Sequence, residues 1–69
     1  MSRLKILGNN IKKAREQKKM SQALLAEKME LSTEYICRVE RGQKHMSLRK
    51  LFELADILDV EFCQLTNFK

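Results

Sequence analysis

The chain has 69 residues, 14 of them lysine or arginine and 9 aspartate or glutamate, which gives a formal charge of +5. A chain of this length forms one domain with a thin core, burying only about 60% of its unfolded surface, so a large internal cofactor and a deep catalytic cleft are excluded. Hydrophobic residues make up 43% of the chain, which excludes a disordered tail. The longest apolar run, Ala23 to Ala26, is too short to span a membrane.

The composition predicts an all-α fold. Leu, Met and Ala make up 18 residues, whereas Val and Ile, which favour strands, number six. There is no proline, and two glycines leave few points at which a helix would break. The N-terminus lacks a signal-peptide stretch, which predicts a cytoplasmic protein in which Cys37 and Cys63 are free thiols.

The positive charge is concentrated in the first fifty residues. Residues 1–50 carry thirteen lysines and arginines against five glutamates, a net charge of +8, whereas residues 51–69 carry Lys69 against four acidic residues, a net charge of −3. This asymmetry indicates one face made for a polyanion, either nucleic acid or an anionic membrane, and another kept away from it. The alternative is a basic face that is merely solvated.

In chain order, the first predicted element is an amphipathic helix that ends at Lys18 and Lys19, because cations stabilise a helix C-terminus. Its apolar positions recur at spacings of three and four residues: Leu4, Leu7, Ile11 and Ala14.

Two short helices follow. Ser21 is a suitable N-cap for a helix over residues 22–29. The positions available to the core on this helix are Ala23, Leu25, Ala26 and Met29. Ser32 is the N-cap of the next helix, Thr33–Arg41, and Gly42 closes that helix in a left-handed conformation.

The last third of the chain is predicted to hold a polar loop over residues 43–46, a helix over residues 48–58 capped by Ser47, and a final short helix. The broad buried face of the longer helix consists of Leu48, Leu51, Leu54, Ala55 and Leu58. Asp59 and Val60 turn the chain into the final helix, which carries Phe62 and Leu65.

The helices over residues 22–29 and 33–41, joined by about three residues, have the helix-turn-helix pattern. Ile36 and Val39 face inward on the second helix. The outward positions are Thr33, Glu34, Cys37, Arg38 and Arg41. An exposed helix with short polar groups and arginines fits the major groove of B-DNA, where Arg38 can donate two hydrogen bonds to guanine.

Two segments of this motif resemble a known family. Residues 21–26 read S-Q-x-x-L-A and residues 36–42 read I-x-x-V-E-R-G. Together with Ile11, Arg15 and the leucines of residues 48–58, they are similar to the Cro- and phage-repressor-type (lambda-repressor-like, XRE) helix-turn-helix domains of bacterial transcription regulators. The resemblance covers about residues 4–66. It implies a compact, all-α, five-helix DNA-binding domain over residues 1–69, with the motif at about residues 21–42.

The resemblance also implies residue roles. The positions that match base-contacting residues are Ser32, Thr33, Glu34 and Arg38. Those that match backbone-contacting residues are Gln22, which also braces the recognition helix, Arg41, Gln43, Lys44 and His45. Arg15 and Glu40 match a partly buried structural ion pair.

Three residues depart from the family pattern. Glu30 stands where the family usually has glycine in the inter-helix turn, which predicts an adjusted or mildly strained turn. Leu24 stands where a polar residue is common, which leaves an apolar side chain exposed. Glu34 places an acid on the DNA face, where it either accepts from cytosine N4 or repels phosphate and sharpens specificity.

These patterns predict a sequence-specific double-stranded DNA-binding transcriptional regulator, acting as a twofold dimer on an inverted repeat. No cofactor, metal or small-molecule effector is expected, because the chain ends at Lys69 without a sensor domain and His45 has no companion ligands. An enzyme is disfavoured, since no nucleophile stands at a useful spacing from His45. Membrane binding is disfavoured, because the first helix needs its apolar stripe for the core. Cys37 is expected to be a passive small residue rather than a redox sensor.

A second hypothesis is an antitoxin-like protein-interaction module whose DNA binding is secondary. Its partner protein would dock on the acidic C-terminal end of the chain. Leu65 and Phe68, near that end, are expected to be either core residues or contacts between the subunits of a homodimer.

Overall fold

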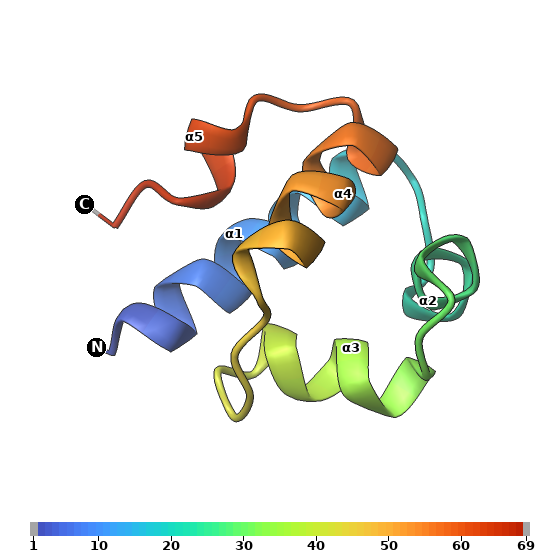
Figure 1. Ribbon diagram of the computed structural model, residues 1–69, viewed down its shortest axis with the longest axis horizontal. Helices are drawn as coiled ribbons and strands as arrows, with labels where there is room; N and C mark the ends of the chain where they lie inside the picture. Colours follow the sequence, from blue (N-terminus) through green and yellow to red (C-terminus); the bar gives the residue numbers. More distant parts are fainter. Residues whose placement is uncertain (1, 69) are drawn as a thin grey trace.

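The computed structural model describes residues 2–68 and folds them into five helices; Met1 and Lys69, which the charge count includes, lie outside the described residues. The helices are α1 (Arg3–Gln17), α2 (Gln22–Met29), α3 (Thr33–Glu40), α4 (Leu48–Leu58) and α5 (Phe62–Leu65). The described part of the chain contains no strand. Figure 1 shows α1 behind α4 at the centre, with α2 and α3 packed to one side and α5 at the other. The predicted all-α, five-helix fold is confirmed.

Serines begin four of the five helices. The hydroxyls of Ser2, Ser21, Ser32 and Ser47 accept hydrogen bonds from the backbone N–H three residues later, over 3.0 to 3.2 Å. Each hydroxyl satisfies a donor that the helix leaves without a partner, which is worth about 1 kcal/mol. The caps at residues 21, 32 and 47 were predicted from the sequence, whereas the one at Ser2 was not.

Left-handed residues end the four longer helices. Gly42 has φ 76°, and Lys19, Glu30 and Asp59 have φ between 55° and 57°. At Gly42 the backbone closes with Gln43 N–H donating to Arg38 O over 2.9 Å and Gly42 N–H donating to Val39 O over 3.0 Å. The left-handed conformation costs little at Gly42, but a non-glycine residue is strained by roughly 1–2 kcal/mol. The left-handed φ of Glu30 therefore agrees with the expected strain in the turn between α2 and α3.

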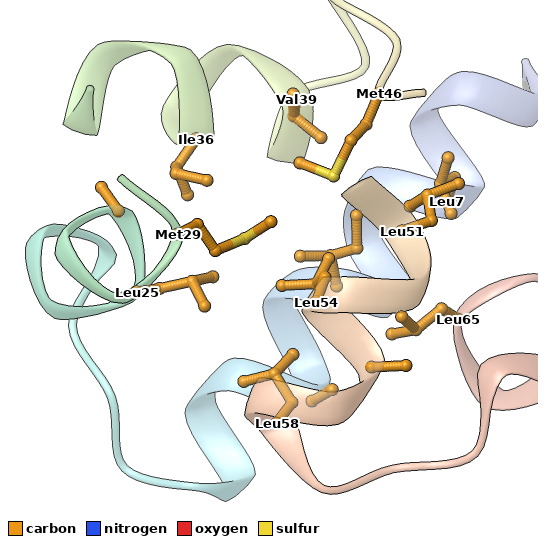
Figure 2. Packing of buried hydrophobic residues seen from close by; sticks show 14 residues of the cluster. Leu7, Leu25, Met29, Ile36, Val39, Met46, Leu51, Leu54, Leu58 and Leu65 are labelled. Atoms are coloured by element: carbon orange, nitrogen blue, oxygen red, sulfur yellow. The ribbon is translucent and has the colours of Figure 1, made fainter. Parts of the chain in front are cut away.

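All five helices and the α3–α4 loop contribute to one apolar core. Figure 2 shows Ile36 and Val39 of α3 pointing into the core, toward Met29 of α2 and Met46 of the loop. Three expectations for individual residues were wrong. Ala23 and Leu48 are exposed rather than buried, because each lies in the first turn of its helix, on the side away from the core. Met46 of the expected polar loop is only 5% exposed and fills space between α1, α3 and α4 (Figure 2).

The C-terminal segment is fixed to α1. The Asn10 amide donates hydrogen bonds to the backbone carbonyls of Leu65 and Asn67, over 3.0 and 2.9 Å. The Leu65 side chain has no exposed surface. It is therefore a core residue of its own subunit, and its assignment as a dimer contact is wrong. Phe68, the other expected dimer contact, is 41% exposed.

Candidate DNA-binding site

The C-terminal end of α3 is held against α1 by a buried ion pair. Arg15 Nε donates to Glu40 Oε2 over 2.7 Å and Arg15 Nη2 donates to Glu40 Oε1 over 3.2 Å, with both side chains less than 10% exposed. The hydrogen bond with Glu40 raises the pKa of Arg15 above its ordinary value, although burial alone would lower it. Arg15 Nη1 also donates to Met20 O over 2.7 Å. The structure thus brings the expected ion pair together.

Gln22 extends this contact to a third helix. Its side-chain amide Nε2 donates to Glu40 Oε1 over 2.9 Å. One carboxylate of α3 therefore receives hydrogen bonds from α1 and from the first residue of α2. The sequence assigned Gln22 a bracing role without naming its partner, because only the fold brings residues 18 positions apart within hydrogen-bond distance.

Gly8 allows α1 and α3 to approach closely. A Cβ atom at this position would lie 2.4 Å from Val39 O and 2.5 Å from Glu40 O, both of them backbone atoms. A side chain at residue 8 would therefore force the last turn of α3 away from α1. No role was predicted for Gly8, since the residues beside it in the sequence do not reveal that two helices cross at this point.

The expected base-contacting residues lie on the outer side of α3. Ser32, Thr33, Glu34 and Arg38 are all exposed, whereas Ile36 and Val39 are 1% exposed and hold the opposite side in the core. Cys37 is half-buried between the two sides. In Figure 1, α3 lies along the edge of the molecule.

Glu34 and Arg38 are paired on this outer side. Arg38 Nη2 donates to Glu34 Oε1 over 2.7 Å, one helical turn apart, and the side chains remain 49% and 72% exposed. The sequence assigned each residue a separate contact to DNA. Their spacing of four residues was sufficient to predict the pair.

The expected backbone-contacting residues are grouped at the end of α3. Arg41, Gln43, Lys44 and His45 are all exposed, and Gln22 is half-buried. The Tyr35 hydroxyl donates a hydrogen bond to His45 O over 3.0 Å and so ties the α3–α4 loop to α3. Lys44 of that loop lines a hollow together with Ser32, Glu34, Tyr35 and Arg38. This hydrogen bond was not predicted, because no local sequence pattern links the Tyr35 hydroxyl to a backbone carbonyl ten residues away.

A model of the helix-turn-helix family matches residues 11–65, which include α2 to α5 and the C-terminal half of α1. The chain belongs to the helix-turn-helix family. This assignment confirms the predicted resemblance, and the matched range includes both helices of the motif and the Arg15–Glu40 contact. No curated protein sequence matches the chain significantly.

Solved structures of three proteins share this helix-turn-helix fold. The restriction-modification controller protein C.AhdI from Aeromonas hydrophila is 37% identical, with a TM-score of 0.84 over 90% of this chain and 94% of its own. The clp gene regulator ClgR from Corynebacterium glutamicum is 24% identical, with a TM-score of 0.92 over 99% of this chain and 87% of its own. Apo-HppE is 27% identical, with a TM-score of 0.87 over 94% of this chain and 36% of its own. The family and the controller protein confirm the predicted class, a DNA-binding transcriptional regulator.

Residues 2–68 contain neither a metal-binding cluster nor a membrane-spanning helix. No group of three or more His, Cys, Asp or Glu side chains in this range is placed to hold a metal ion. None of its helices combines the length and the apolarity needed to cross a bilayer. Cys37 and Cys63 are both free thiols, as predicted.

Proposed function

We propose that the protein is a sequence-specific regulator that inserts α3 into the major groove of double-stranded DNA. The observation that carries this proposal is the two-sided construction of α3. Its inner side is fixed by the core and by the contacts of Glu40 with Arg15 and Gln22. Its outer side presents polar groups of the kind that pair with base edges. A helix held this rigidly reads bases without reordering its backbone.

In this proposal, bases are read by the outer side of α3, on which Ser32, Thr33, Glu34 and Arg38 lie. Residues at the N-terminal end of a recognition helix usually meet base edges, and Ser32 and Thr33 stand at that end of α3. Arg38 supplies the fork of donors that guanine O6 and N7 accept.

The contacts to the phosphates come from both ends of the motif. Arg41, Gln43, Lys44 and His45 follow α3, and Gln22 begins α2. Gln22 Nε2 carries two N–H groups and uses one on Glu40, so the other is available to a phosphate oxygen. Contacts of this kind set the register of α3 on the duplex and carry no sequence information.

We further propose that the protein binds as a homodimer on an inverted repeat. Leu48 and Phe52, one turn apart on α4, are 61% and 50% exposed, and Phe68 is also exposed. Exposed apolar side chains of this size support self-association, and a twofold dimer places two copies of α3 in grooves about 34 Å apart. Sedimentation of the wild type and of Leu48→Ser, each bound to DNA, tests the proposed dimer. A wild type that binds DNA as a monomer would contradict it.

A second candidate function is supported by a groove between α4 and α5. Phe52 stacks on Phe62 with ring centroids 4.3 Å apart. Further lining residues are Ala55, Asp56, Asp59, Val60, Glu61 and Gln64. Aromatic rings beside three carboxylates suit a basic partner protein, as an antitoxin-like module would require. This function would be favoured if one small protein co-purifies with the wild type but not with the Phe52→Ser variant.

The proposal is for binding without catalysis, in the cytoplasm, with no metal, cofactor or small-molecule effector. Its direct test is selection of bound duplexes from a random DNA library. The enriched sequence gives the half-site, and the distance between two half-sites gives the arrangement of the subunits. A wild type that enriches no sequence would refute sequence-specific binding.

A further inference from the structure

We propose that Glu34 acts as a positioning residue that selects which edge of the Arg38 guanidinium faces the DNA, so that the two side chains read one guanine as a unit. This inference rests on the proposed insertion of α3 into the major groove. It adds a determinant of specificity that acts through Arg38 rather than through a base contact of Glu34.

The geometry of the guanidinium explains how a single contact selects an edge. The group offers two pairs of parallel donors that fit guanine, one formed by Nη1 and Nη2 and the other by Nε and Nη2. Nη2 contributes one hydrogen to each pair, and it donates one of these hydrogens to Glu34 Oε1 over 2.7 Å. Whichever hydrogen is engaged, one edge is occupied and the other remains complete. Guanine O6 and N7 then meet a single, fixed edge.

The surroundings of Arg38 support the same orientation. Lys44 and Tyr35 line the hollow beside the pair, and the Tyr35 hydroxyl holds the loop that carries Lys44. A cation at Lys44 repels a guanidinium that swings toward the loop, whereas the carboxylate of Glu34 attracts it along α3. Arg38 is thus placed between an attractive and a repulsive neighbour on the exposed side of the helix.

Removal of the Glu34 charge has two opposite consequences for binding. A free Arg38 samples several rotamers and reaches phosphate oxygens, which are the same for every sequence. The loss of a negative charge on the DNA face also strengthens attraction to any duplex. Preference for guanine therefore falls while affinity for random DNA rises. A merely structural role for Glu34 would move neither quantity in this way.

The test compares Glu34→Gln, Arg38→Lys and the double variant with the wild type, using the duplex that the wild type enriches from a random library. Substituted duplexes at each base pair and a random-sequence duplex complete the set. Glu34→Gln is expected to lower the preference at the Arg38 base pair roughly threefold to tenfold, part of the ~5- to 150-fold discrimination of a bidentate contact. Affinity for the random duplex is expected to rise about twofold to fivefold. The double variant is expected to match Arg38→Lys in its preference at that base pair.

Glu53→Gln is the matched control. Glu53 also pairs with an arginine four residues away on an exposed helix side, with 3.8 Å between Arg49 Nε and Glu53 Oε1, but it lies on α4. The same chemical change there is expected to leave the preference for guanine unchanged. Unchanged thermal melting of Glu34→Gln and Arg38→Lys verifies that both variants fold.

Two results would overturn the inference while leaving the proposed function intact. One is an unchanged preference at the Arg38 base pair in Glu34→Gln. The other is a loss at a different base pair that adds to the loss in Arg38→Lys, since Glu34 would then read a base of its own. If the wild type enriches no sequence, or if Arg38→Lys and Lys44→Ala bind every duplex as the wild type does, the proposed function fails and the inference fails with it.

Discussion

The α3 helix makes two contacts between an arginine and a glutamate, both 2.7 Å long, on its two opposite sides. Arg15 and Glu40 meet in the interior, whereas Arg38 and Glu34 meet in solvent. Removal of one partner from a buried pair leaves an uncompensated charge and typically costs about 3–5 kcal/mol. An exposed pair four residues apart on a helix is worth about 0.3–0.5 kcal/mol, because water and salt screen it. Burial, rather than distance, therefore separates a contact that maintains the fold from one that is available for recognition.

The largest effect is expected from Glu40→Ala. This change removes the acceptor of both Arg15 and Gln22 and leaves the Arg15 charge buried, so the free energy of unfolding should fall by about 3–5 kcal/mol. Urea denaturation followed by circular dichroism measures it. Glu34→Ala is the matched control on the outer side of the same helix and should change stability by less than about 0.5 kcal/mol. Equal losses in the two variants would contradict the contrast between the pairs.

Arg38→Ala should act on binding alone. We expect the selected duplex to bind about 1–3 kcal/mol more weakly, with reduced preference at one base pair, because the two hydrogen bonds to guanine are lost. The denaturation midpoint should not change, since the Arg38 side chain is half-exposed. Titration of labelled duplexes measures the affinity. Intact binding of the selected duplex would refute the assignment of α3 as the recognition helix.

Lys44→Ala should weaken binding without altering base preference. Lys44 is exposed on the loop after α3 and is expected to contact a phosphate, so the selected and random duplexes should lose affinity by similar factors. The slope of log affinity against log salt should become flatter by about 1. Lys13→Ala is the control, because Lys13 lies with Gln64 at the α1–α5 side of the molecule. Equal effects of the two variants would contradict a phosphate contact specific to Lys44.

Tyr35→Phe should have the smallest effect. The change removes only the hydroxyl that donates to His45 O, and it is expected to cost about 0.5–1.5 kcal/mol of binding, equally for all sequences. Amide hydrogen exchange in residues 43–46 should become faster, while exchange in α1 stays the same. Unchanged exchange in the loop would show that the hydrogen bond does not hold it.

Much of the fold could be predicted because its signals are local. A serine before each of three apolar patterns predicted the starts of α2, α3 and α4 to the residue. Gly42 and Glu30 revealed two left-handed helix ends, since the first suits that conformation and the second replaces a family glycine. Leu48 and Ala23 were misassigned, because in the first turn of a helix the apolar pattern extends in only one direction and the edge of the buried face is ambiguous.

The candidate site divides in the same way. The exposure of the outer side of α3 follows from helical spacing, and so does the Glu34–Arg38 pair once the two residues are considered together. Other features depend on chain segments that only the tertiary fold brings together. They are the hydrogen bond of Gln22 with Glu40, the hydrogen bond of the Tyr35 hydroxyl with His45 O, and the burial of Met46 in the core. No local pattern in the sequence encodes those distances.

Gly8 has a consequence for evolution and for engineering. The carbonyls of Val39 and Glu40 occupy the space that a methyl group at residue 8 would need, so the tilt of α3 depends on a hydrogen atom in α1. A Gly8→Ala change would push the last turn of α3 away from α1, acting from the side opposite to the proposed base-contacting residues. Variation in the choice of operator can therefore arise at a position that touches no base, and a search for altered specificity confined to the outer side of α3 would overlook it.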